Sequence, residues 1–145
     1  MSFTNAYDQI RTELATLFSS YNELDNPYDL ERNPDLHLRE SYGITIGSGE
    51  NTTKVLCSRA DISRIFGIVL CRRMNATRND TATRITAEKA LFEDLTDIIK
   101  VFEEPVANIT QGRYVSDDGV EFLDGDRYNY LILRSSFLIE YSESL

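Results

Sequence analysis

The 145-residue sequence predicts an α+β domain, with a mainly antiparallel sheet, two amphipathic helices packed on one face and a long C-terminal strand. Residues 4–24 and 86–104 carry apolar side chains at helical spacing, whereas residues 36–74 and 111–141 show the alternating or continuous apolar patterns of strands. Elements grouped in such blocks are typical of α+β folds. The length and the 41% apolar content fit a single domain, residues 1–145.

The first helix is predicted from apolar and aromatic residues that recur every three or four positions over 4–24. The stripe consists of Tyr7, Ile10, Leu14, Leu17, Phe18, Tyr21 and Leu24. We interpret it as a face that packs on the core. The next segment, 25–35, contains two Asn-Pro steps, and because a residue before proline avoids the helical region, we expect an irregular crossing loop there.

The middle of the chain predicts strands. From Leu36 to Ile46 the apolar residues fall on alternate positions, which indicates a half-buried strand, and residues 54–58 are expected to form a short return strand. A second strong strand is predicted over 62–74. Its run from 65 to 71 is almost continuously apolar, as in a central strand that is covered on both faces.

The second helix is expected over 86–104, with Thr86 as its N-cap. Beyond it, residues 117–119 (Asp-Asp-Gly) predict a hairpin turn and residues 124–126 (Asp-Gly-Asp) a second one. Residues 128–141 then read as one long strand. Because it exceeds the usual strand length, we expect it to extend past its own domain and pair elsewhere.

The formal net charge of −9 argues against a generic basic nucleic-acid binder, but the charge is unevenly spread. The net charge is −6 over residues 1–53, +5 over 54–84 and −8 over 85–145. Three interpretations of the arginine-rich middle stay open. It is a solvated basic strand pair, a face that meets the acidic face of another copy, or a local contact for nucleic acid.

Association of copies head to tail would use the basic middle and the last strand. The candidate subunit-interface residues are Arg64, Arg72, Arg73, Arg134, Glu140 and Tyr141.

The sequence offers no catalytic, cofactor-binding or metal-ligating set, so we expect no enzyme activity. The one histidine, His37, falls on the polar side of a predicted strand, and Cys57 and Cys71 are expected to be reduced because the N-terminus has no signal-peptide pattern. No phosphate-binding loop or nucleophile elbow is present, and no apolar run is long enough to cross a membrane. The acidic residues of 117–126 are explained by the two predicted turns.

The element order, together with residues 126–133 (DRYNYLIL) leading to 137–141 (FLIEY), resembles the tail terminator (tail completion) proteins of tailed bacteriophages over nearly the whole chain. The resemblance implies a structural protein of the virion, assembled in the host cytoplasm, that forms a homohexameric ring on the head-proximal end of the tail tube. Such a ring ends tube growth, contacts the tail tube protein and the neck or stopper protein, and lets double-stranded DNA pass through a channel without specific binding. It implies no catalytic residue, cofactor, metal or membrane.

Other classes remain as alternatives. A stopper, neck or tube protein of the head–tail junction is the nearest. A small acidic inhibitor or DNA mimic would be a monomer or dimer that captures a basic partner, and the +5 middle segment argues against it. A small enzyme would have to use carboxylates or Cys57 and Cys71.

Overall fold

Two helices and six strands form the part of the chain that the computed structural model describes, residues 3–30, 40–47, 52–56, 59–74, 81–125 and 128–144. The helices are α1 (Phe3–Leu17) and α3 (Thr81–Phe102), and the strands are β1 (Asn22–Glu23), β2 (Ser41–Ile46), β3 (Thr52–Leu56), β4 (Arg59–Met74), β5 (Gln111–Asp124) and β6 (Asn129–Ser144). The predicted α+β class and the long C-terminal strand are confirmed.

The six strands form one sheet in the order β1-β2-β4-β6-β5, and β3 pairs with β4 on the same side as β2. The β1–β2 pair is parallel and all other pairs are antiparallel. The central pair is β4 with β6, which runs without interruption from Arg59 opposite Ser144 to Met74 opposite Asn129.

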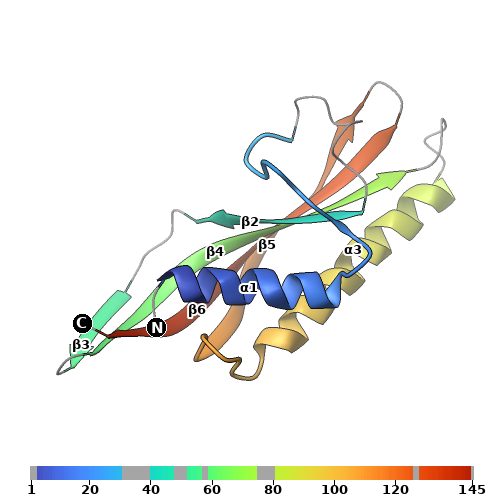
Figure 1. Ribbon diagram of the computed structural model, residues 1–145. Coiled ribbons are helices and arrows are strands. Elements are labelled where there is room, and N and C mark those ends of the chain that lie inside the picture. Colours follow the sequence, from blue (N-terminus) through green and yellow to red (C-terminus); the bar gives the residue numbers. More distant parts are fainter. Residues whose placement is uncertain are drawn as a thin grey trace.

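Both helices pack on the same face of the sheet, as predicted, and Figure 1 shows them side by side there. Every second residue of the central strands points to this face and packs against the helices. Buried contributors to this core include Ile10 and Leu14 of α1, Leu91 and Ile98 of α3, and Phe66, Ile68, Leu70, Leu133, Phe137 and Ile139 of the sheet. The prediction that β4 is a central strand covered on both faces is confirmed, because its residues Val69 and Cys71 are buried on the opposite face.

The second face of the sheet is covered in part by the segment from Leu24 to Leu30. These two leucines are only 6% and 5% exposed, and they pack with Val69 and Cys71 of β4 and with Tyr130 and Ile132 of β6. This second small core means that β2 is not half-buried as predicted. Its residues 41–44 are buried on both faces.

The first helix is shorter than predicted, ending at Leu17 rather than at residue 24. The Phe18 N–H still reaches Leu14 O, but the Asn22 N–H then donates to Glu40 O and the Leu24 N–H to Tyr42 O. Pairing with β2 replaces the helical hydrogen bonds beyond residue 18. The apolar periodicity of the sequence extends to Leu24, but Leu24 packs on the other face of the sheet.

The second helix begins earlier than predicted, at Thr81, and ends at Phe102. Thr86 is therefore not an N-cap, and its hydroxyl donates to Ala82 O within the helix at 2.9 Å. A threonine bonded in this way satisfies its own side chain without ending the helix.

The predicted hairpin turn at 117–119 is wrong, because β5 is one strand that passes through it. The register with β6 shifts between Tyr114 and Ser116 and again between Asp117 and Val120, as in β-bulges. Gly119 has φ 74°, and the Asp117 carboxylate accepts its N–H at 2.8 Å. The Asp-Gly signal that predicted a turn marks an irregularity inside a strand. The reversal lies at the second signal, where the Gly125 N–H donates to Tyr128 O.

Strand β6 lies inside the sheet, flanked by β4 and β5, instead of leaving the domain. Its length is used within the chain, because residues 141–144 continue to pair with β4 beyond the start of β5. Together with β3 and residues 59–63 of β4 they form a three-stranded extension that we call the arm, which projects beyond the N-terminal end of α1 in Figure 1.

The segment over the second face predicts a sensitive glycine in β2. A Cβ on Gly43 would lie 2.8 Å from the Cβ of Pro27 and 3.2 Å from Leu24. Gly43→Ala should therefore lower the free energy of unfolding by about 1–3 kcal/mol, as overpacked sites do, measured by urea denaturation. The exposed turn variant Ser19→Ala should change it by less than about 0.5 kcal/mol, and equal effects of the two would contradict this close packing.

Candidate functional site

Among the described residues, Cys71 is the one histidine or cysteine. His37 and Cys57 lie outside the described residues, and Cys71 is 1% exposed, with burial raising the pKa of its thiol to about 12. A thiol that is buried and protonated is a poor nucleophile. The described ranges contain no group of three or more histidine, cysteine, aspartate or glutamate residues placed to hold a metal ion.

Arg72 lies on the helix-covered face, between the sheet and α3. Its guanidinium is 3.4 Å from the Asp94 carboxylate and also donates to the Tyr21 hydroxyl, which in turn bonds the same carboxylate at 3.0 Å. The side chains of Arg72 and Asp94 are 24% and 12% exposed. This cluster joins β4, α3 and the turn after α1, so Arg72 acts inside the subunit.

The cluster shifts the protonation of its members. Burial, together with the Asp94 charge, raises the pKa of Tyr21 to about 12. Burial also raises the pKa of Asp94, against the lowering effect of its bonds to Tyr21 and Arg72. Tyr21 therefore stays a neutral donor, and its hydrogen bond together with the Arg72 charge favours the ionised form of the buried carboxylate.

Three further candidate interface arginines also have partners within the chain. The Arg64 guanidinium lies over the Phe3 ring at 5.4 Å, and that of Arg73 over the Tyr128 ring at 4.2 Å. Arg134 forms an ion pair with Glu121 of β5. All three arginines are partly exposed, and contacts of this kind contribute little to stability at exposed positions.

The last two candidates lie in adjacent positions of β6 but differ in exposure. Tyr141 is 2% exposed and belongs to the core beneath the helices, whereas Glu140 lines a surface pocket of about 400 Å³. Of the six predicted residues, then, Arg72 and Tyr141 are held inside the fold. The structure does not bring the other four together, and their role at an interface stays a prediction.

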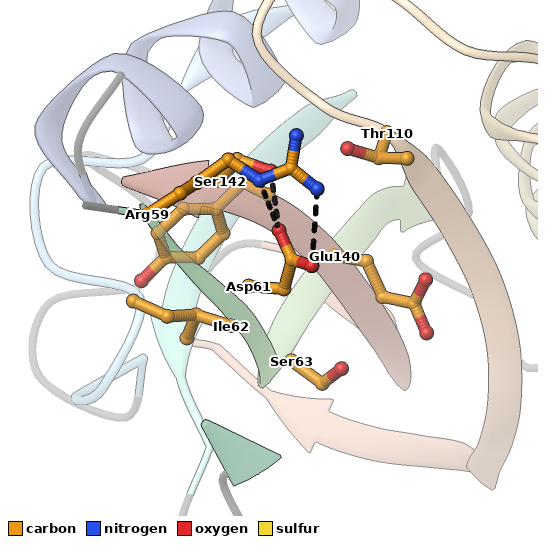
Figure 2. A pocket seen from close by; sticks show the side chains of 8 residues that line it. Arg59, Asp61, Ile62, Ser63, Thr110, Glu140 and Ser142 are labelled. Atoms are coloured by element: carbon orange, nitrogen blue, oxygen red, sulfur yellow. Dashed lines mark hydrogen bonds and ion pairs between the residues drawn. The ribbon is translucent and has the colours of Figure 1, made fainter. Parts of the chain in front are cut away.

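The pocket beside Glu140 lies over the β4–β6 pair in the arm. Figure 2 shows Arg59, Asp61 and Ser142 grouped on one side of it, with Thr110 and Glu140 on the other. Arg59 pairs with Asp61 at 3.1 Å, and the Ser142 hydroxyl donates to the same carboxylate at 2.8 Å. The bonded residues Asp61 and Ser142 are 81 positions apart in the sequence, so no local motif indicates the group, which follows from the register of β4 with β6.

The side of the sheet formed by β5 and the end of β6 is protected unevenly along its length. Strand β5 forms one edge along its whole length, and it carries two bulges and exposed acidic residues, including Asp118, Glu121 and Asp124. Bulges and charges on an edge hinder the addition of another strand. Residues 141–144 of β6 extend past the first residue of β5, Gln111, and their pairing with β4 has no bulge; Glu143 is the charged residue among them.

The comparisons with known proteins add no relative. No family model matches the chain, and no curated protein matches it. Within the described ranges, neither helix combines the length and apolar character that a membrane crossing requires.

The Arg72 cluster predicts a pH-dependent stability effect. Because the pKa of Asp94 is raised in the folded state, its contribution to stability is complete below its ordinary pKa of 3.8 and is lost as the pH rises through the raised value. Arg72→Ala would raise the pKa of Asp94 further. It should therefore lower the free energy of unfolding by about 1–3 kcal/mol at pH 7, less than the loss in a fully buried pair. Near pH 4, where the carboxyl is largely protonated, the loss should be clearly smaller.

Urea denaturation at both pH values measures the difference. The control is Arg84→Ala, which removes an exposed helical pair with Glu88 and should change stability by less than about 0.5 kcal/mol at either pH. An Arg72→Ala penalty that is the same at pH 4 and pH 7 would show that the Asp94 charge is not what the arginine stabilises.

Proposed function

We propose that this chain is a structural protein of a tailed-phage virion that forms a ring at the head-proximal end of the tail tube, where it ends tube polymerisation and joins tail to neck. The observation that carries the proposal is the architecture. The resemblance to tail terminators rests on a first helix, a strand pair, a central strand, a second helix, a polar hairpin and a long last strand. The fold has these elements in that order, except that the single strand β5 stands in place of the hairpin and the short β1 follows the first helix.

The state of the edges supports a role in assembly. A sheet that is blocked along one edge by bulges and charges, but open at the arm, can join copies of itself without uncontrolled aggregation. Such joining is heterologous, and it closes into a ring when the rotation between copies allows it. Strand β3 and the free end of β6 lie on opposite sides of the arm, which suits head-to-tail contact.

The charge distribution supports a channel that DNA crosses without binding. The arginines at 59, 64, 72, 73 and 84 each have an acidic or aromatic partner within the chain. Exposed acidic residues remain on α3, such as Glu93 and Asp97, and along β5. Since tight binding of DNA depends on neutralising phosphates with free cationic groups, this surface disfavours it.

Native mass spectrometry and negative-stain electron microscopy of the purified protein test the proposal. The expected result is a closed ring with a mass near six times the 16.6 kDa of one chain, and no retention of double-stranded DNA at physiological salt. A protein that is monomeric at high concentration, or a dimer that captures basic proteins, would contradict it and favour the acidic inhibitor class.

A further inference from the structure

The outer side of β6 has a free stretch at the arm. The Thr110 N–H donates to Glu140 O at 2.8 Å from the side on which β5 lies. Backbone groups of alternate residues point to the same side of a strand, so Ser142 presents its N–H and C=O there too. Strand β5 begins at Gln111, opposite Glu140, and no described strand continues beside residues 141–144.

On the outer side of β3, too, no strand of the described ranges is paired. The Gly47 N–H donates to Ile65 O. The backbone N–H and C=O groups of the odd-numbered residues of β4 therefore point to the side on which β2 and β3 lie. Lys54 is opposite Asp61, so its backbone N–H and C=O point toward β4. The backbone groups of the alternate residues Thr53 and Val55 then point outward. Val55 is 59% exposed, so the face of β3 that carries its side chain is uncovered.

The two free edges fit each other in direction and register. Both β3 and β6 are antiparallel to β4, so they run the same way. Lys54, Asp61 and Ser142 lie on one line across the arm. Copies placed side by side without sliding therefore bring Lys54 of one copy beside Ser142 of the next, where the Ser142 N–H can donate to Thr53 O and the Val55 N–H to Ser142 O.

We propose that β3 of one copy adds to residues 141–144 of β6 in the next copy as a parallel strand, so that the sheet continues from subunit to subunit around the ring. This proposal rests on the proposed function, which supplies the ring, and assigns the contact between neighbouring subunits to β3 and the end of β6. Charge supports a second copy as the partner, because β3 contains Lys54 and no acidic residue, whereas the end of β6 contains Glu140 and Glu143.

Engineered disulfides test the pairing directly, in a Cys57→Ser background so that no native thiol near β3 interferes. Neighbouring strands lie about 4.8 Å apart, so Lys54→Cys on one copy can bridge Ser142→Cys on the next. Within one chain the same positions are separated by β4, at about twice that spacing, which is too far for a bond. The double variant should form a covalent ladder that stops at the ring size on a non-reducing gel.

The single variants identify the alternatives. Each should remain a single-chain band after oxidation, and mixing the two should give only cross-linked dimers. Cross-linking of Ser142→Cys alone would show a symmetric contact of two β6 edges, and cross-linking of Lys54→Cys alone one of two β3 edges; either would overturn the proposal. A ring that shows no 54–142 cross-link would overturn the pairing and leave the proposed function standing, whereas a monomer in every measurement would remove both.

Proline variants give an independent readout. Val55→Pro removes an outward N–H without removing a bond to β4, so it should weaken assembly at least tenfold in sedimentation or mass photometry while thermal unfolding of the subunit changes little. Val55→Ala keeps the N–H and should assemble normally. Phe122→Pro makes the matched change on the β5 edge and should leave the ring intact; dissociation by Phe122→Pro instead would place the interface at β5.

Discussion

The fold depends on the unbroken antiparallel pairing of β4 with β6. Sixteen residues of each strand take part, and this pair supplies the centre of both cores. Phe66 faces Phe137 beneath the helices, and the Ser135 hydroxyl donates to Ile68 O at 2.9 Å, so that a buried polar side chain is satisfied inside the pair. The helices, β2, β3 and β5 each attach to this ribbon.

The length of the ribbon exceeds what the subunit needs for its own core. Over residues 66–71 of β4 it is covered on both faces, by the helices and by the segment from Leu24 to Leu30. Towards Arg59 the cover thins and the chain ends in the three-stranded arm, where polar groups line the surface pocket. One continuous pair thus connects a rigid, doubly covered centre to an open end, so that any load taken up by the arm is passed directly into the core.

Much of the fold could be predicted from the sequence, because it follows from periodicity. The helical stripe around Leu14, the continuous apolar run before Cys71 and the alternation of the last strand each lead to the right element type. The errors arise where long-range pairing overrides a local signal. The helix stops at Leu17 because residues beyond it bond to β2, and Asp117-Asp118-Gly119 forms a bulge instead of a turn because β6 runs alongside on one side.

The candidate site was less predictable. The run of arginines in the sequence indicates a basic face. Their partners, such as Asp94 for Arg72, come from other elements, and no spacing in the sequence links α3 to β4. The exposure of Glu140 and the burial of its neighbour Tyr141 follow from strand alternation, yet the grouping of Glu140 with Arg59 and Asp61 depends on register. Sequence patterns thus indicate which residues share a face, whereas the charges that meet across elements require the tertiary structure.

The placement of the first thirty residues has a consequence for how the chain folds. Helix α1 covers one face of the sheet and Leu24 to Leu30 the other, so this segment wraps around the β2 side of the sheet. Both halves pack against residues of β4 and of β6, so their apolar side chains are fully covered only when these two strands are paired. Docking of this segment is therefore coupled to the pairing of residues 59–74 with residues 129–144, a contact between distant parts of the sequence whose closure costs chain entropy.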